Sequence, residues 1–402
     1  MTSKISKSNK RLNLQSNPFV KTIDELLKQS PGMIMAQSLK DFTMERSNKK
    51  INIKKGSVII LPKSQFDRTK RASGVCLKPY RRTFSEFFNR YRGQNLNGKK
   101  LLVWRSGGYG DLMFIQPILR YLKNRYPTCQ ITFATSPENV SLFNNWPVGI
   151  IDYVAIIPFD KELMIKHDYH LTFEGVIERC LESRKVNYYD SFKNVAGVKF
   201  EFDEFPLVLD VNPVMNKHFK EIIKSNTIAI QLRASTPLRT LTMEKVKEIV
   251  DRLIVENYNV TFLDSSEYSS WYDQFITNFG YDKTIVSNYT SLCKDITMGI
   301  TILNNCSGII AVDSSFTHFA EALQKPGVGL YGPFPSHLIS KYYKHIKSLN
   351  PPSGWNQCNI APCYLHAHQA SSCPFIRAGK LPGCMQSFDV NDIIKILKDN
   401  IA

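Results

Sequence analysis

The stretch VWRSGGYGDLMFIQP, Val103–Pro117, decides the fold. An apolar run ends in a cluster of glycines, and a helical pattern of apolar residues begins directly after Asp111. A strand that turns sharply on glycines and continues as a helix is the repeating unit of parallel α/β sheets. Because ligands bind at the carboxyl ends of such strands, the stretch also predicts where a binding site lies.

The same alternation extends through most of the chain. From residue 99 onward, strand-like apolar runs alternate with helical periods, and a second series begins near Asn226, where Thr242 is a predicted helix N-cap. The pattern predicts an α/β protein with two Rossmann-like domains facing a central cleft. The predicted parts are a disordered basic tail (1–17), a basic N-terminal extension (18–98), a first Rossmann-like domain (99–215), a second one (216–385) and a C-terminal helix (386–402).

The positive charge of the chain is confined to its N-terminal quarter. Residues 1–100 hold 23 Lys and Arg against 6 Asp and Glu, whereas residues 101–402 hold 29 of each kind. A basic segment on a neutral body favours a polyanionic partner, such as nucleic acid or an anionic surface. A tail that only increases solubility is the alternative.

Two local patterns stand out within the extension. Residues 50–62, KINIKKGSVIILP, predict a β-hairpin that turns at Lys54, Lys55 and Gly56. Residues 78–93 place aromatic side chains at helical spacing and predict a helix. Its aromatic rings could stack on bases while its arginines neutralise phosphates, or the aromatic stripe could simply dock the helix on the body. The candidate nucleic-acid contacts are Arg81, Arg82, Arg90 and Arg92.

Apolar runs and cysteines set the expected compartment. No window reaches the roughly 18 apolar residues of a membrane helix, and the N-terminal stretch lacks a signal-peptide pattern, so we expect a cytoplasmic protein without a membrane span. The nine cysteines are scattered, which favours free thiols or a metal site over disulfides. Four of them within 27 residues could hold a structural zinc, with buried thiols as the alternative: Cys358, Cys363, Cys373 and Cys384.

The glycine turn of the opening stretch does not match a dinucleotide fingerprint. Gly107, Gly108 and Gly110 are spaced too closely, and no acidic residue follows the next predicted strand to hold a ribose. What remains is a tight turn that brings backbone close to a ligand. Asp111 follows at the start of the helix, where it could cap the helix or act as a general base for a hydroxyl group.

Two further clusters follow strands of the second series. In GIIAVDSSFTHFAEAL, a strand ends at Asp313, and Ser314, Ser315 and His318 lie at the start of the next helix. Free backbone N–H groups, hydroxyls and the helix dipole at such a position suit a diphosphate. In QLRASTPLRTLT, Arg233 and Arg239 flank a loop and are suited to forked contacts with phosphate oxygens.

Together the two motifs, RSGGYGD with its helix and DSSFTHFAEALQKPGVGLYGP, resemble the ADP-heptose:lipopolysaccharide heptosyltransferases of glycosyltransferase family nine, over about residues 99–390. The resemblance implies a GT-B fold, in which residues 99–215 bind the acceptor, residues 216–385 bind a nucleotide-diphosphate sugar, and the last helix crosses back to the first domain. The basic extension has no counterpart in the typical enzyme.

The resemblance also assigns roles to residues. Asp111 corresponds to the catalytic base, and Glu174 follows a strand in a loop similar to the acceptor-facing loop. The implied acceptor side further comprises Gly107, Gly108, Tyr109 and Gly110. The implied donor side comprises Arg239, Asp313, Ser314, Ser315, His318 and, for the ribose, Glu267, with Arg233 added from its position. Ser315 replaces the usual glycine, and RTLT replaces a lysine-tryptophan-proline element, which are departures on the donor side.

These observations predict an inverting glycosyltransferase. No D-x-D element ends a strand in either half, so we expect no catalytic metal or other cofactor beyond the nucleotide-sugar donor. The charge density of the extension favours DNA as the polyanionic acceptor, through a hydroxymethylated base of the kind found in virus-encoded systems, flipped into the cleft. Lipopolysaccharide inner core is the alternative acceptor, and a non-catalytic nucleic-acid-binding protein is the alternative class.

Overall fold

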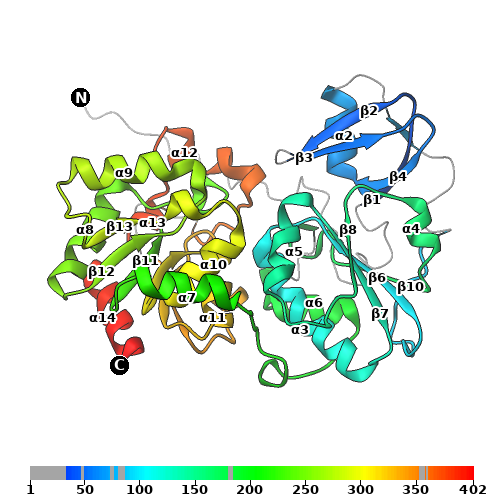
Figure 1. Ribbon diagram of the computed structural model, residues 1–402. Helices are drawn as coiled ribbons and strands as arrows, with labels where there is room; N and C mark the ends of the chain where they lie inside the picture. Colours follow the sequence, from blue (N-terminus) through cyan, green and yellow to red (C-terminus); the bar gives the residue numbers. More distant parts are fainter. Residues whose placement is uncertain are drawn as a thin grey trace.

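The computed structural model describes residues 33–46, 49–72, 77–79, 87–179, 184–352, 358 and 361–402. Within them a small β-rich domain is followed by two α/β domains that lie next to each other (Figure 1). The small domain lies beside the first α/β domain, and the C-terminal helix lies on the second. The predicted pair of α/β domains is confirmed, and the fold is that of GT-B enzymes.

The small domain is built on one antiparallel sheet that it shares with the first α/β domain. Its strands are β1 (Met33–Ser38), β4 (Val58–Pro62) and β5 (Leu77–Pro79), with β9 (Phe159–Asp160) added by the α/β domain. Two further strands, β2 (Phe42–Arg46) and β3 (Lys49–Ile53), form a separate ribbon, and α2 (Lys63–Ala72) packs on β1 and β4. The shared sheet fixes the small domain to its neighbour.

The hairpin predicted over residues 50–62 is wrong. β3 pairs with β2, whereas β4 pairs with β1 on one side and β9 on the other. The chain still turns near Gly56, whose φ is +84°, but this turn joins two different sheets. All five residues of β4 are buried, so burial between two neighbours, rather than the local turn, decides the pairing of this strand.

The first α/β domain carries a four-stranded parallel sheet in the order β10-β6-β7-β8. The strand β6 leads into the glycine turn and is buried after its first residue, as the apolar run predicts. The strands are β6 (Lys100–Arg105), β7 (Gln130–Thr135), β8 (Tyr153–Ile156) and β10 (Tyr169–Thr172). The helices are α3 (Tyr109–Arg125), η3 (Pro137–Asn145), α4 (Lys161–Ile165), α5 (Val176–Arg179), α6 (Tyr188–Ala196) and η5 (Phe202–Glu204).

The aromatic stretch before this domain is not helical where it is described. Residues 87–93 form a turn and an isolated parallel bridge between Arg90 and His170, which extends the edge of the sheet at β10. The Phe88 ring lies 5.7 Å from the rings of both Trp104 and His170, and Tyr91 is buried. These aromatic residues therefore dock the chain on the body. The remainder of the predicted helix, with Arg81 and Arg82, lies outside the described residues.

The second α/β domain carries a six-stranded parallel sheet in the order β13-β12-β11-β14-β15-β16. Its strands are β11 (Thr227–Gln231), β12 (Asn259–Phe262), β13 (Val286–Asn288), β14 (Gly308–Val312), β15 (Gly327–Leu330) and β16 (Ile346–Leu349). Its longer helices are α7 (Pro213–Ile222), α8 (Met243–Val255), α9 (Ser269–Asn278), α10 (Ile296–Asn305), α11 (Ser315–Ala322) and α14 (Val390–Ile401). Its short helices are η6 (Pro237–Arg239), η7 (Ser266–Tyr268), η8 (Thr290–Leu292), η9 (Ser336–Leu338), η10 (Ala367–Ser372), α12 (Pro374–Arg377) and α13 (Gly383–Gln386). Thr242 accepts a hydrogen bond from the Lys245 N–H and caps α8 as predicted.

The C-terminal helix differs from the prediction. α14 packs against α8 and against the strands β14, β15 and β16 of the second domain, instead of crossing back to the first. Its apolar face, which includes Ile393, Ile394 and Leu397, is buried in the core of that domain. The helix α7 packs on α10 of the second domain.

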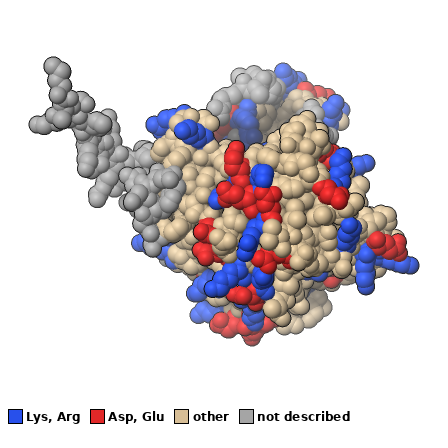
Figure 2. Space-filling view, turned by 90° about the vertical axis from the view of Figure 1, so that its left-hand side faces the viewer, with Lys and Arg blue, Asp and Glu red and all other residues tan. Residues whose placement is uncertain are grey.

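The outer face of the second domain carries no large patch of one charge. Figure 2 shows acidic and basic side chains interspersed there. Several are paired along and between helices, as in the Arg252–Glu256 and Lys398–Glu256 ion pairs at 3.1 and 2.5 Å. Within the described part of the chain, none of the helices combines the length and apolar character that a bilayer-spanning segment requires.

Candidate active site

A cavity of about 720 Å³ lies between the two α/β domains and brings most of the predicted site residues together. The first domain contributes the glycine turn and the start of α3, and the second contributes three loops that follow β11, β12 and β14. The predicted residues that line it are Gly107, Gly108, Tyr109, Gly110, Asp111, Arg233, Arg239, Glu267, Asp313, Ser314, Ser315 and His318. Elements separated by some hundred residues or more thus share one site.

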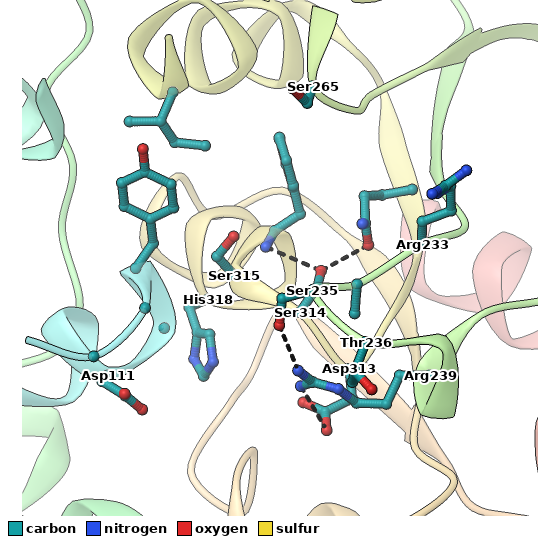
Figure 3. Close-up of a pocket in the computed structure, with 18 of the residues that line it drawn as sticks. Asp111, Arg233, Ser235, Thr236, Arg239, Ser265, Asp313, Ser314, Ser315 and His318 are labelled. Atoms are coloured by element: carbon teal, nitrogen blue, oxygen red, sulfur yellow. Dashed lines mark hydrogen bonds and ion pairs between the residues drawn. The ribbon is translucent and has the colours of Figure 1, made fainter. Parts of the chain in front are cut away.

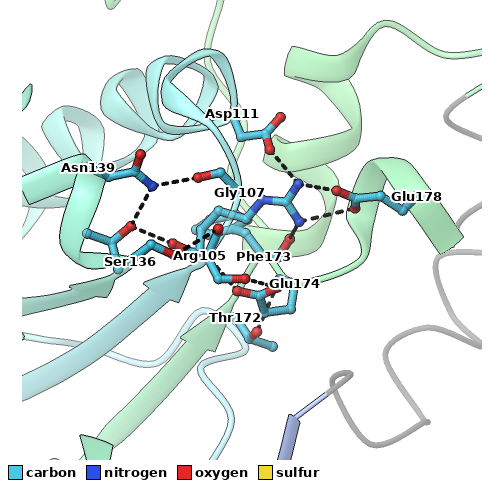
Figure 4. A network of polar contacts seen from close by, with 11 residues as sticks. Arg105, Gly107, Asp111, Ser136, Asn139, Thr172, Phe173, Glu174 and Glu178 are labelled. Carbon is cyan, nitrogen blue, oxygen red and sulfur yellow. Dashed lines mark hydrogen bonds and ion pairs between the residues drawn. The ribbon is translucent and has the colours of Figure 1, made fainter. Parts of the chain in front are cut away.

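Asp111 faces a buried arginine instead of capping its helix. The N-cap of α3 is Gly108, which has no side chain to donate or accept a hydrogen bond. The Asp111 Oδ2 atom accepts a hydrogen bond from Arg105 Nη2 at 2.6 Å, and the Arg105 side chain is 1% exposed (Figure 4). The capping role considered from the sequence is therefore not what this carboxylate does.

Arg105 is shared between two carboxylates. Its guanidinium donates to both oxygens of Glu178, at 2.6 and 3.2 Å, and to the Phe173 carbonyl at 3.1 Å (Figure 4). Burial raises the pKa of Asp111, although the attraction of Arg105 opposes the shift. Burial would also raise the pKa of Glu178, but the two strong contacts to Arg105 outweigh it and lower that pKa to about 2. Asp111 is thus the carboxylate of this pair that is suited to accept a proton.

The glycine turn leaves no room for a side chain at Gly107 and only a tight fit for one at Gly110. A Cβ atom on Gly107 would lie 2.0 Å from Asp111 Oδ2 and 2.5 Å from Arg105 Nε. A Cβ atom on Gly110 would lie 3.0 Å from His318 Nε2 of the second domain. Asn139 holds the turn by donating a hydrogen bond to the Gly107 carbonyl at 2.6 Å. The glycines therefore permit the close approach of the carboxylate, its arginine and the opposite domain.

Glu174, predicted to contact an acceptor, does not line the cavity. Its carboxylate accepts hydrogen bonds from the Ser106 backbone N–H and from Ser106 Oγ, so it holds the glycine turn from behind (Figure 4). Glu178, four residues later in α5, lines the cavity instead. The sequence signal for Glu178 was the second glutamate of FEGVIER, four residues after Glu174. The turn followed by a helix decides which of the two glutamates faces the cavity.

Opposite Asp111, the second domain presents a cradle of groups suited to bind a phosphate. Ser314 is the N-cap of α11, where its Oγ atom accepts from the Phe316 N–H at 3.3 Å and donates to Gln231 at 2.7 Å. Arg239 contacts Asp313 at 3.2 Å and Ser235 at 3.3 Å (Figure 3). A guanidinium beside the N-terminus of a helix favours an anion.

His318 lies in the first turn of α11 and joins the two domains. Its Nδ1 atom is hydrogen-bonded to the Tyr343 hydroxyl, and its ring lies 4.9 Å from the Phe114 ring of the first domain. Burial, helped by the nearby Arg239 charge, lowers the pKa of His318 to about 3. The imidazole is therefore neutral near pH 7, so it supplies shape and hydrogen bonding to the site but no positive charge.

A third group of residues, around Arg233, lines the end of the cavity away from Asp111 (Figure 3). The guanidinium carbon of Arg233 lies 3.7 Å from the centre of the Tyr268 ring, and its Nε atom lies 3.7 Å from Asp264. Glu267, in η7, is exposed at the same end. Asp264 and Tyr268 were not expected from the sequence, because only the fold brings the loop after β12 against the loop after β11.

The candidate nucleic-acid contacts do not belong to this cavity. Arg90 is half-buried, and burial together with the Arg92 charge lowers its pKa to about 10. Arg92 is exposed, and neither residue lines the cavity. The aromatic rings next to them are packed inward, so the described part of this stretch offers no stacking surface for bases.

The four C-terminal cysteines lie near one another, and two of them pack beside the loop that follows β11. Cys363 and Cys373 pack with Leu365 against Leu238 of η6, next to Arg239. Burial, together with the other three thiols of the group, raises the pKa of Cys384 to about 12. Among the described residues no three or more His, Cys, Asp or Glu have the arrangement of a metal site, so the structural zinc stays a prediction.

A family model matches this region of the chain. Residues 193–362 match the model described as glycosyltransferase family 9 (heptosyltransferase). The chain carries a glycosyltransferase family 9 domain. The resemblance drawn from the two sequence motifs is therefore confirmed, and so is the interpretation of the chain as a glycosyltransferase. No curated protein matches the chain.

Solved structures share the fold of this glycosyltransferase at low sequence identity. The glycosyl transferase family 9 protein of Veillonella parvula has a TM-score of 0.59 and 15% identity, with 77% of this chain and 98% of that chain covered. E. coli ADP-heptose lps heptosyltransferase II has a TM-score of 0.57 and 14% identity, with 75% and 98% covered. The iron-containing dodecameric glycosyltransferase TibC from enterotoxigenic E. coli has a TM-score of 0.54 and 13% identity, with 92% and 90% covered.

Coverage distinguishes these neighbours. The match covers almost all of heptosyltransferase II but 75% of this chain, so about a quarter of this chain has no counterpart in that protein. TibC, which was also solved in complex with ADP-D-β-D-heptose, matches 92% of the chain. The parts outside the minimal pair of α/β domains are thus largely shared with TibC.

Proposed function

We propose that this family 9 glycosyltransferase transfers a heptose, with inversion at the anomeric carbon, from an ADP-heptose donor to a hydroxyl group. The observation that carries the proposal is the single cavity that Asp111 shares with the cradle of Arg239, Asp313 and Ser314. The ADP-heptose complex of TibC, and the description of heptosyltransferase II, support this choice of donor.

In the proposed reaction Asp111 acts as the general base. It accepts the proton of the acceptor hydroxyl while the hydroxyl oxygen bonds to the anomeric carbon. Arg105 orients the carboxylate, and Glu178 remains ionised and balances the charge of Arg105 when Asp111 becomes protonated. The raised pKa of Asp111 fits a group that must take up a proton during the reaction.

Arg239 and the N-terminus of α11 stabilise the departing ADP. The bond between the anomeric carbon and the phosphate oxygen breaks with its electron pair, so negative charge builds on the β-phosphate. Arg239 and the backbone N–H groups after Ser314 are the chain's own groups for that charge. Arg233, stacked on Tyr268, and Glu267 would hold the nucleoside end.

As the acceptor we propose lipopolysaccharide inner core and not DNA. Among the described aromatic residues that would have stacked on bases, Tyr91 is buried and Phe88 packs against Trp104 and His170. The solved relatives are described as heptosyltransferases. The small domain remains rich in positive charge, with 11 Lys and Arg against 3 Asp and Glu over residues 33–79. Phosphorylated core saccharide offers a matching polyanion.

One assay tests donor and acceptor together. Purified enzyme receives ADP-heptose with heptose-deficient lipopolysaccharide, with hydroxymethylated DNA or with a protein extract, and the mass gain of each acceptor is measured. Protein is included because TibC matches more of the chain than the lipopolysaccharide enzyme does. Label on the core saccharide supports the proposal. Label on DNA or protein alone overturns the proposed acceptor. If the enzyme releases no ADP from ADP-heptose, the proposed reaction is wrong.

We further propose that the four C-terminal cysteines hold a structural metal ion. Their thiols are near enough to act on one another electrostatically, and thiolates are soft donors that iron and zinc prefer. The iron reported for TibC supports iron. The segment supports Leu238, so we expect loss of the metal to weaken donor binding. Metal analysis of the purified enzyme, compared with a Cys363→Ser and Cys373→Ser variant, tests this, and equal metal content overturns it.

A further inference from the structure

Tyr188 is a second polar group in the cavity that the sequence did not reveal. It is the first residue of α6 and lies at the junction of the domains, because the preceding Asn187 donates a hydrogen bond to the His337 carbonyl at 2.9 Å. The Tyr188 side chain lines the cavity and is 5% exposed. Its ring packs edge-on against Phe114 of the first domain and Phe334 of the second, at 5.8 and 6.4 Å. The ring is therefore held in place from both sides.

The hydroxyl of Tyr188 is available to a ligand. No described residue forms a hydrogen bond with it. Burial raises the pKa of Tyr188 well above its ordinary value, and among the nearby charges Asp313 contributes most, followed by Asp111. The phenol therefore stays protonated at any working pH of the enzyme and can only donate its proton into a hydrogen bond or accept one from a donor.

We propose that Tyr188 is a catalytic residue that donates a hydrogen bond to the phosphate oxygen leaving the anomeric carbon. This inference rests on the proposed function. The acceptor oxygen forms a bond to the anomeric carbon, the bond from that carbon to the phosphate oxygen breaks, and the electron pair leaves with ADP. The acceptor proton goes to Asp111, and Tyr188 keeps its own proton while its hydrogen bond strengthens.

The charges around the hydroxyl favour the leaving group over the acceptor. Asp313 and Arg239, which both act on Tyr188, form the cradle that receives the diphosphate. Asp111 already serves as the proton acceptor on the other side. The hydrogen bond of a buried neutral donor near both groups strengthens most where new negative charge appears, and that is the leaving phosphate. Tyr188 would thus add a donor from the first domain to the groups supplied by the second.

The adjacent Tyr189 provides a matched control. Tyr189 follows Tyr188 in α6 and is 1% exposed, but its ring packs against Phe114 and Phe202, both at 4.9 Å, and does not line the cavity. We expect Tyr188→Phe to lower kcat roughly 100-fold, as for loss of one donor to a developing anion, with little change in the KM for the donor. Tyr189→Phe should keep kcat within about threefold, since it removes no group from the cavity.

Two readouts separate this inference from the proposed function. Heptosyl transfer is measured on the labelled acceptor, and slow hydrolysis of ADP-heptose, which breaks the same bond with water as acceptor, is measured without one. If Tyr188→Phe hydrolyses ADP-heptose more slowly while Tyr189→Phe matches the wild type, the inference is supported even when no acceptor is labelled. If both Phe variants match the wild type, or both lose activity equally, the role of Tyr188 is refuted. If the wild type neither transfers nor hydrolyses, the donor assignment fails and this inference with it.

Discussion

The two sides of the cavity handle charge in opposite ways. On the first domain, two carboxylates, Asp111 and Glu178, share the single buried Arg105. On the second domain, Arg239 contacts the buried carboxylate of Asp313 beside the N-terminus of α11. The first side therefore has a carboxylate ready to take up a proton, and the second side is arranged to receive an anion.

This difference explains why the site needs two domains. Asp111 is paired with Arg105 inside the first domain, and Arg239 is paired with Asp313 inside the second, so the base and the cradle do not pair with each other. Separate sheets place them on opposite sides of one cavity. Substitutions on the Asp111 side and on the Arg239 side of the cavity should therefore have separable effects.

The largest effect is expected for Asp111→Asn. Loss of the base should lower kcat on the order of 1000-fold, as for removal of a positioned general base. The affinity for ADP, measured by calorimetry, should stay within about twofold, because the cradle belongs to the other domain. Unchanged transfer by this variant would show that Asp111 is not the base of the reaction.

Gly107→Ala should come next. Its Cβ atom would lie 2.0 Å from Asp111 Oδ2, so the carboxylate or Arg105 must move. A displacement of about 1 Å of a catalytic group costs on the order of 100-fold in rate. Gly108→Ala is the matched control, since nothing lies within 4 Å of a Cβ atom there. Equal kinetics for the two variants would show that the turn does not set the position of the base.

Arg239→Gln tests the other side. Loss of one charged contact to the leaving phosphate should lower kcat/KM roughly 30-fold, equivalent to about 2 kcal/mol. Arg252→Gln, on the outer face of α8, is the control and should leave the kinetics unchanged. Steady-state rates at varied ADP-heptose concentration check both. A loss that is equally large in the two variants would point to destabilisation of the domain.

The smallest effect is a shift in pH dependence. Asp111 must be ionised to act, so kcat/KM should fall as the pH drops through its pKa, which lies above the ordinary 3.8. The Glu178 charge helps to raise that pKa. Glu178→Gln should therefore move the acid limb of the kcat/KM profile to lower pH.

Glu174→Gln provides the comparison for this profile. Glu174 faces Ser106 and does not line the cavity, so we expect the acid limb to stay where it is in the wild type. The same variant tests the sequence-based prediction that Glu174 contacts the acceptor. An increased KM for the acceptor with an unchanged acid limb would favour that prediction. A profile that shifts equally in both variants would show that the pKa of Asp111 does not depend on the sharing of Arg105 with Glu178.

Local patterns predicted the architecture and much of the site. Alternating strands and helices indicated the two α/β domains, and the motifs RSGGYGD and DSSFTH supplied residues that meet in one cavity. The pairing of β3 and β4 could not be predicted, because a strand chooses its neighbour by burial and not by the nearest turn. The aromatic spacing predicted a helix that residues 87–93 do not form, because their rings pack on a sheet edge formed about 80 residues later.

What the sequence determined by itself is the set of local units: a strand ending in glycines, an aspartate at a helix start, and serines at another. These follow from backbone preferences within a few residues. Only the tertiary structure decided which side chains meet. Arg105 stands in the opening stretch, yet its partner Glu178 lies 73 residues away, and Tyr188 joins the site only because α6 starts at the domain junction. Contacts between distant segments depend on how the sheets pack, and that information is not local.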